Sequence, residues 1–350
     1  MSSLSRRKFL KAAVGGVFAA GFLGSRDAGA VFMGPEQKRE ELLLNHESLL
    51  SQPVHNQTEP ALDKKGEHFI QVDLEPYNYT KGDAKIRMDY YPVEGAGPHP
   101  PLIILPMLGG ISFIERGLAR YYAKHGFPSL IVSTPKEDRD AIKHALGTVR
   151  SEANVPHLAD TFNEVYRKGI LNVMRVIDWI GARPELDEER IGAVGISLGA
   201  IQLASVMGVY GKQKYIKAGA CMLGGAGMHH IISHSQEPGI KRDRDALLKT
   251  IGRDEAWLEE RLYGEFPWDS LHHAHNIDPD SIILFIGKGD TYVPTKSGKD
   301  LAAAIGNPRV EMVGTWARFL PLIDGHLAAF FKKGKIQKQA LEFFQARLYA

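Results

Sequence analysis

A serine between two glycines, Gly195-Ile196-Ser197-Leu198-Gly199, is the stretch of this chain whose residue types and spacing could most directly do chemistry. Residues 190–194 before it contain β-branched apolar residues and predict a strand, whereas the apolar residues 198–207 after it predict a helix. A sharp strand-to-helix turn brings backbone close to backbone, so a Cβ at either glycine would clash. The helix N-terminus would favour negative charge beside the hydroxyl. We therefore predict that Ser197 is a nucleophile.

A serine hydroxyl is a weak nucleophile at neutral pH, so it needs a neighbouring base and an acid that orients the base. The candidate acid is Asp290, which follows the apolar run 282–286 in a glycine-rich turn. Because ligands bind at the carboxyl ends of strands in open α/β sheets, a carboxylate there is well placed. The alternative is that Asp290 only shapes the turn.

The candidate base is His326, in Asp324-Gly325-His326, between a predicted strand at 309–313 and a terminal helix. A single histidine in a loop is more often a surface residue, but its position and the preceding glycine favour catalysis. Asp324 is a competing acid. Because it lies two residues from His326 on the same loop, we expect it to form a turn or to support the site indirectly.

The order Ser197, Asp290, His326, with a strand before each, resembles the α/β-hydrolase family over about residues 65–350. The resemblance implies a nucleophile elbow, a catalytic triad and an oxyanion hole of two backbone N–H groups. Leu198 would give one N–H, and the loop after strand 102–105 the other. Many members have His-Gly-Gly-Gly in that loop, whereas this chain has Pro106-Met107-Leu108-Gly109-Gly110. Leu108 is our first choice and Met107 the second.

The elements that must position these residues alternate along the chain. Such alternation predicts a mostly parallel sheet with helices on both faces, the α/β-hydrolase fold. Two runs with alternating polarity are expected to be edge strands, 68–74 and 85–92. The remaining predicted strands are 102–105, 129–133, 190–194, 216–223, 281–286 and 309–313. The predicted helices are 113–125, 161–180, 198–207, 295–305 and 335–348.

Two regions stand apart from this alternation within the expected domain, residues 67–350. Residues 31–66 are predicted to be an N-terminal surface extension, with a helix at 35–50 and a loop at 51–65. Residues 224–276 show no strand pattern and include a charged helical stretch at 241–262. We expect this insertion to be a helical cap over the site, with apolar residues too few to bury one another well. The cluster Gly224–Gly227 is expected to be its hinge.

The N-terminus has the three parts of a signal peptide in order. A basic start with Arg6 and Arg7 precedes an apolar stretch at 12–24 and the small-residue sequence Ala28-Gly29-Ala30. The paired arginines resemble the signals of bacterial twin-arginine export; a chance pair before a buried helix is the alternative. We predict a signal peptide at 1–30, the export machinery as a partner, a periplasmic or secreted location, and no membrane span in the mature chain.

Charge and composition narrow the classes of partner and cofactor. The formal net charge is +2, of which residues 1–30 contribute +4 through five basic side chains and one acid, so the remainder carries −2. A nearly neutral body argues against nucleic acid or an anionic membrane as the main partner. The one cysteine, Cys221, excludes an intrachain disulfide and is expected to be a core residue.

Two groups of histidines could be taken for metal ligands. They are His229, His230 and His234, and His272, His273 and His275. Neither group has an H-E-x-x-H pattern or an evident third ligand, so we expect no metal and no cofactor.

The sequence thus predicts an exported serine hydrolase acting on a carboxylic ester or thioester of a small-molecule acyl substrate. A peptidase or acyltransferase of the same fold is the first alternative. A non-catalytic binding protein built on a hydrolase fold is the second.

Overall fold

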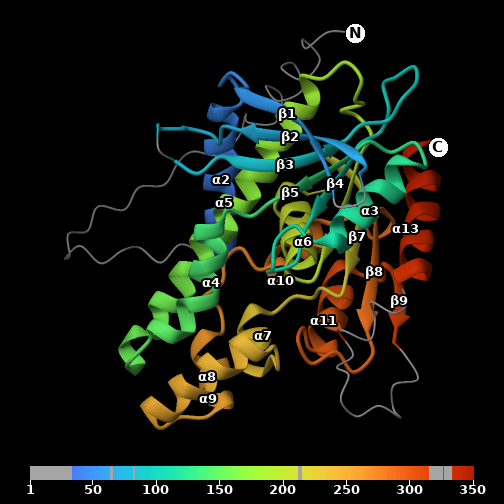
Figure 1. Cartoon of the computed structure of the whole chain (residues 1–350). Helices are drawn as coiled ribbons and strands as arrows, with labels where there is room; N and C mark the ends of the chain where they lie inside the picture. Colours follow the sequence, from blue (N-terminus) through green and yellow to red (C-terminus); the bar gives the residue numbers. More distant parts are fainter. Residues whose placement is uncertain (1–33, 64–65, 82, 212–214, 315–325, 327–332) are drawn as a thin grey trace, which may run out of the picture. The chain divides into compact units, whose positions relative to one another are not determined.

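A nine-stranded sheet forms the centre of the described part of the chain (Figure 1). The computed structural model describes residues 34–63, 66–81, 83–211, 215–314, 326 and 333–350; the predicted leader and Asp324 lie outside these ranges. The strand order is β1-β2-β3-β5-β4-β6-β7-β8-β9. The strands are β1 (Asn56–Leu62), β2 (His68–Leu74), β3 (Ile86–Tyr91), β4 (Leu102–Leu105), β5 (Ser129–Val132), β6 (Ile191–Ile196), β7 (Ile216–Met222), β8 (Ile282–Gly287) and β9 (Arg309–Val313).

The sheet is antiparallel at one end and parallel across the rest. β1, β2, β3 and β5 pair antiparallel, and every pairing from β5 through β4 and β6 to β9 is parallel. Parallel strands covered on both faces should be apolar throughout. Every residue of β4, β5, β6 and β8 is indeed buried. The predicted mostly parallel sheet is confirmed.

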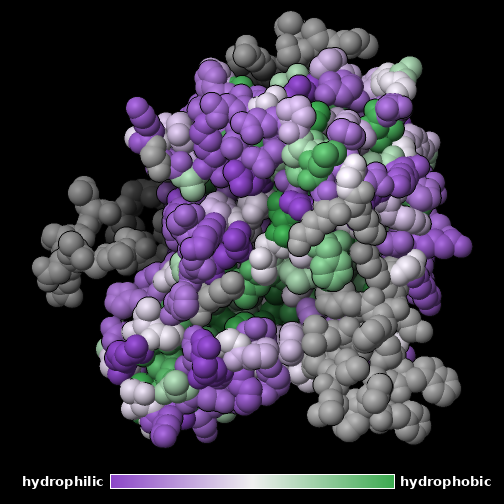
Figure 2. Space-filling view, in the orientation of Figure 1, coloured by the Kyte–Doolittle hydropathy of each residue, from purple (hydrophilic) through white to green (hydrophobic). Residues whose placement is uncertain are grey.

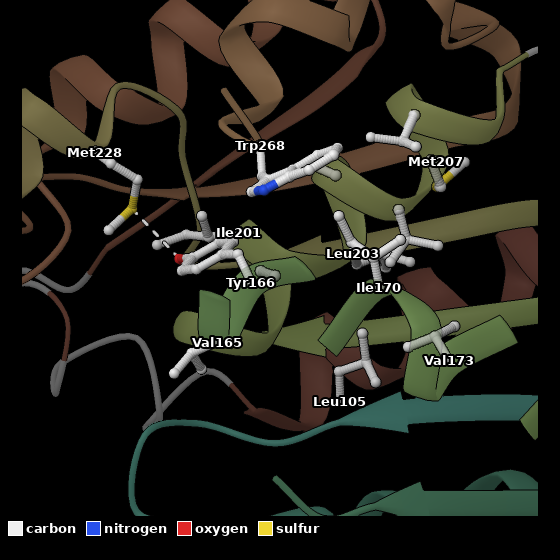
Figure 3. Close-up of a cluster of buried hydrophobic side chains, with 14 of the residues drawn as sticks. Leu105, Val165, Tyr166, Ile170, Val173, Ile201, Leu203, Met207, Met228 and Trp268 are labelled. Atoms are coloured by element: carbon white, nitrogen blue, oxygen red, sulfur yellow. Dashed lines mark hydrogen bonds between the residues drawn. The ribbon is translucent and has the colours of Figure 1, made fainter. Parts of the chain in front are cut away.

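Helices cover both faces of this sheet. The α-helices are α2 (Pro35–Leu49), α3 (Phe113–Ala123), α4 (Lys136–Thr148), α5 (Val155–Gly181), α6 (Leu198–Tyr210), α7 (Met228–His234), α8 (Pro238–Ile251), α9 (Glu255–Leu262), α10 (Ser270–His273), α11 (Thr295–Ile305) and α13 (Lys333–Leu348). Because side chains alternate along a strand, Leu102 and Ile104 pack with α3 and α13, whereas Ile103 and Leu105 pack with α5 and α6. Figure 3 shows Leu105 beneath side chains of α5 and α6.

The N-terminal extension differs from the prediction. β1 occupies residues 56–62, where a loop was expected, and it pairs along its length with β2. β2 and β3 are therefore interior strands and not edges. β1 contains Pro60 and is almost wholly exposed, as an edge strand can be. The predicted helix is present as α2, whose Arg39 Nε donates to the carbonyl of Val209 at 2.6 Å.

The insertion after β7 is helical, and it packs on the body of the chain. The predicted helix at 241–262 is two helices, α8 and α9, because Gly252 adopts φ +69° and ends the first. Leu247 of α8 and Leu258 and Leu262 of α9 are buried; α8 packs against α4, and α9 packs against both α5 and α7. Phe266 meets Phe162 of α5 edge to face, with ring centroids 6.2 Å apart. Figure 3 shows the hydroxyl of Tyr166, also in α5, bonded to the sulfur of Met228.

The glycines before this insertion serve close packing. A Cβ on Gly224 would lie 2.5 Å from the Cβ of Ala200, and one on Gly225 would lie 2.6 Å from the Cβ of Ser297. These glycines let the chain pass tightly between α6 and α11, and the hinge at residues 224–227 stays a prediction.

Candidate active site

Ser197 stands at the corner between β6 and α6. Its backbone has φ 54° and ψ −115°, a left-handed conformation that is strained for a residue with a side chain and costs on the order of 1–3 kcal/mol. Hydrogen bonds hold it there. Its N–H donates to the carbonyl of Met222 at 2.8 Å, and its own carbonyl accepts from Ala200 N–H at 2.9 Å. This is the sharp strand-to-helix turn that the sequence predicted.

The two glycines of the motif are required sterically, as expected. A Cβ on Gly195 would lie 2.5 Å from the Cα of Ala200, and one on Gly199 would overlap the backbone of Leu105. The second close approach sets the N-terminal start of α6 against the carboxyl end of β4. The loop that follows β4 is thereby brought to the same corner as Ser197.

Asp290 and His326 form a buried pair. His326 Nδ1 donates to Asp290 Oδ2 at 2.8 Å, and the two residues are 5% and 4% exposed. The other carboxylate oxygen, Oδ1, accepts from the backbone N–H groups of Tyr292 and Val293, each at 3.0 Å. The carboxylate is therefore fixed in orientation. It holds the imidazole with Nδ1 turned toward Asp290, which fixes the orientation of the ring.

The loop after β8 is braced from the insertion. Ser235 Oγ donates to the carbonyl of Tyr292 at 2.7 Å, and Gln236 N–H donates to the carbonyl of Thr291 at 2.8 Å. The ring of Tyr292 stacks on His326 with centroids 5.4 Å apart. No sequence motif points to Tyr292, whose only signal is its place two residues after Asp290.

The topology of the sheet puts Ser197 and Asp290 at the same end of the parallel strands, their carboxyl end. β6, β7 and β8 are adjacent and parallel, and both residues follow the carboxyl ends of their strands. Neighbouring strands lie about 4.8 Å apart, so the two strand ends are separated by about 10 Å. An imidazole paired with Asp290 is of a size to occupy that gap.

A buried glutamate organises the loop after β4. Glu115 is fully buried; its Oε2 accepts from the N–H of Ser112 at 2.8 Å and from its hydroxyl, and its Oε1 accepts from Met107 N–H at 3.4 Å. Gly110 N–H closes the loop onto the carbonyl of Met107 at 2.8 Å. Ser112 and Glu115 form a capping box at the start of α3, a signal that is readable in the sequence. Met107 N–H is thus engaged, whereas Leu108 lies half-buried between these anchors.

The histidine groups separate in space. His273 is fully buried and its Nε2 bonds the carbonyl of Pro267 at 2.8 Å; burial lowers its pKa, as for a core residue. His229 packs edge to face against Tyr263, with centroids 5.1 Å apart. His230 and His234 instead converge on Glu259. Cys221 is buried, as predicted.

One cleft among the described residues holds none of the predicted catalytic residues. A cleft of about 720 Å³ is lined by α2, α4, α5 and the segment 76–84, with Lys38, Asp138 and Trp268 among its residues. Ser197, Asp290 and His326 are absent from that lining. The chemistry of the elbow therefore belongs elsewhere.

Comparison with known proteins identifies the fold. No family model matches the chain, and no curated protein matches it significantly in sequence. An acetyl xylan esterase from a Paenibacillus species superposes with a TM-score of 0.63 at 14% identity, over 89% of this chain and 94% of that one. Acetyl xylan esterase 1 from a Thermoanaerobacterium species gives 0.59 at 14% identity, with the same coverages of 89% and 94%. An acylaminoacyl peptidase from Pyrococcus horikoshii gives 0.51 at 14% identity, over 87% of this chain and 43% of that one.

These similarities establish the α/β-hydrolase fold, as the sequence predicted. At this level of identity they bear on the fold alone.

Proposed function

We propose that this protein is a serine hydrolase that cleaves a carboxylic ester or thioester through an acyl-enzyme on Ser197. The proposal rests on two observations at the carboxyl ends of the parallel strands. These are the strained backbone of Ser197 and the buried pair of Asp290 and His326. Strain of this kind persists where the surrounding structure requires it, often at functional sites. The esterases among the structural neighbours agree with this chemistry.

In the proposed reaction, Ser197 Oγ attacks the acyl carbon while His326 Nε2 takes its proton. The tetrahedral oxyanion accepts hydrogen bonds from the N–H groups of Leu198 and Leu108. Glu115 supports the choice of Leu108, because it already binds the N–H of Met107. The imidazolium of His326 then gives its proton to the leaving alcohol or thiol. Water, deprotonated by His326, attacks the acyl-enzyme; the bond from the acyl carbon to Ser197 Oγ then breaks, His326 returns the proton to Oγ, and the acid leaves. Asp290 keeps the ring in the required orientation throughout.

The substrate is proposed to be a small molecule with a short acyl group. Figure 2 shows hydrophobic side chains lining a hollow between the helices α7–α9 and the rest of the described chain. An acyl group needs an apolar surface of this kind. The mixed polar and apolar composition of residues 224–276, which we propose act as the cap, favours short acyl groups over long-chain lipids.

Export by the twin-arginine route to the periplasm or beyond is part of the proposal and rests on the leader sequence. In the described ranges, no helix is both long and apolar enough to cross a membrane. The test is N-terminal sequencing of protein recovered from the periplasmic fraction. A mature N-terminus near Val31, abolished when Arg6 and Arg7 are replaced by lysine, is expected. Unprocessed protein confined to the cytoplasm would contradict it.

A fluorophosphonate probe tests the enzymatic proposal. It should label the wild-type chain and a Ser205→Ala control, whose changed serine is buried in α6, but not Ser197→Ala. Chromogenic esters of graded acyl length, with matched anilides, then separate an esterase from a peptidase. Added alcohol acceptors reveal an acyltransferase. Absence of Ser197-dependent labelling would favour a binding protein on a hydrolase fold.

A further inference from the structure

Two histidines one turn apart on α7 and a glutamate on α9 face one another. His230 Nδ1 lies 2.8 Å from Glu259 Oε1, and His234 Nε2 lies 2.7 Å from Glu259 Oε2. One ligand atom from each residue lies within 4.8 Å of the others. Residues four apart share one face of a helix, so α7 presents both rings together. The packing of α9 against α7 adds the carboxylate.

We propose that His230, His234 and Glu259 bind a divalent first-row transition ion, with zinc the best match. Two imidazole nitrogens and a carboxylate oxygen form a typical three-ligand set for zinc, with water in the fourth position. Bonds of about 2.0–2.1 Å in a tetrahedral site set ligand atoms about 3.3 Å apart. The nitrogen–oxygen distances here are slightly shorter, so small side-chain rotations suffice. The side chains are 15–31% exposed, which leaves an entry path.

The residues around the cluster are arranged to orient the ligands of a bound ion. A zinc-bound histidine usually donates its other ring nitrogen to a carboxylate, which fixes the ring and raises its basicity. His234 Nδ1, the nitrogen turned away from Glu259, lies 3.4 Å from Glu255 Oε2. Glu255 is in turn held by the guanidinium of Arg244, which is fully buried, at 2.9 Å. A ligand histidine, its supporting carboxylate and an anchor for that carboxylate are thus all present.

A bound ion would link α7 to α9 next to the residues that hold the loop after β8. α7 ends at His234, and the next two residues are those whose hydrogen bonds hold Thr291 and Tyr292. Linking α7 to α9 therefore also fixes the segment that braces the loop after β8. The competing interpretation is that Glu259 only accepts hydrogen bonds from two imidazoles. The two interpretations differ in what happens when zinc is supplied.

The test uses the full chain without a polyhistidine tag, stripped with a chelator and dialysed against graded zinc. The chain has 14 histidines, so adventitious binding is controlled by a matched variant, His229→Ala, which changes the neighbouring ring on α7. We expect one tight zinc per chain in the wild type and in this control. His234→Ala and Glu259→Gln should weaken binding by about 100-fold or more, and Glu255→Gln by about 10-fold. Cobalt should give the visible spectrum of a tetrahedral site.

A second readout covers a variant that folds poorly. Zinc should raise the melting temperature of the wild type and His229→Ala, and leave that of Glu259→Gln unchanged, since the amide preserves the shape of the side chain. The proposal is overturned if the wild type takes up no stoichiometric zinc. It is equally overturned if Glu259→Gln and His234→Ala bind zinc as the wild type does, or if His229→Ala loses it to the same extent.

Discussion

Replacement of Asp290 by asparagine should remove most activity while leaving the fold intact. Oδ1 accepts from the two backbone N–H groups of Tyr292 and Val293, so an asparagine must keep its carbonyl oxygen there. Its NH₂ then takes the place of Oδ2, 2.8 Å from His326 Nδ1, and donates to that nitrogen. The imidazole must now carry its proton on Nε2. That is the atom proposed to accept the proton of Ser197.

The expected loss is large. A wrong histidine tautomer in a Ser-His-Asp triad lowers kcat by about 10⁴, which is about 5.4 kcal/mol of transition-state free energy. The cost in folding free energy should be smaller, about 1–2 kcal/mol, because a charged acceptor for two backbone N–H groups becomes a neutral one. The assay is hydrolysis of a short chromogenic ester, with thermal unfolding followed by circular dichroism on the same samples.

Two other aspartates serve as controls for this substitution. Asp300→Asn changes a carboxylate on α11 that pairs with Lys296, and it should keep wild-type kcat. Asp324→Asn tests the competing acid and should reduce activity only modestly. Retention of more than about a tenth of kcat in Asp290→Asn would refute the reasoning above. A collapse in Asp324→Asn instead would assign the acid to that residue.

Three further predictions address the supports of the site. Gly199→Ala should lower the free energy of unfolding by about 1–3 kcal/mol or more, because the new Cβ would overlap the backbone of Leu105. Gly109→Ala is the control, since no atom lies within 4 Å of its Cβ, and it should leave stability in urea unchanged. Equal urea midpoints for the two variants would contradict this. Glu115→Gln should lower kcat about 10-fold with little change in KM, because it loosens the loop proposed to supply an oxyanion donor; an unchanged kcat counts against that role. Burial raises the pKa of the Cys221 thiol to about 12, so at pH 8 about one molecule in 10⁴ carries a thiolate and native protein should resist alkylation. The thiol ionises at a lower pH in the unfolded chain than in the folded one. Its contribution to the free energy of unfolding is therefore fully present below about pH 9 and is lost as the pH rises toward 12. Urea denaturation measured across that pH range tests this.

The strands around the site could be predicted because a strand buried on both faces has a continuous run of apolar residues. β4 and β9 have the predicted bounds, and β8 differs by one residue at each end. β1 was missed because an exposed edge strand carries no hydrophobic period, and its Pro60 argues for a loop. Its place in the sheet comes from the ladder with β2, which no local pattern encodes.

The site divides in the same way. The sequence placed Asp290 and His326 by their order along the chain, and the structure brings these two together. Contacts that arise only from the packing of separate helices could not be predicted from the sequence. Glu259 follows His234 by 25 positions on another helix, so the side-chain cluster they form could not be recognised from spacing alone.

A crystal structure of the chain after reaction with a phosphonate ester tests the central claim most directly. The account predicts phosphorus bonded to Ser197 Oγ, with the phosphoryl oxygen accepting from the N–H groups of Leu198 and Leu108. His326 Nε2 should lie within hydrogen-bond distance of Ser197 Oγ while Nδ1 remains on Asp290. An adduct on another residue, or an imidazole remote from the phosphorylated oxygen, would contradict it.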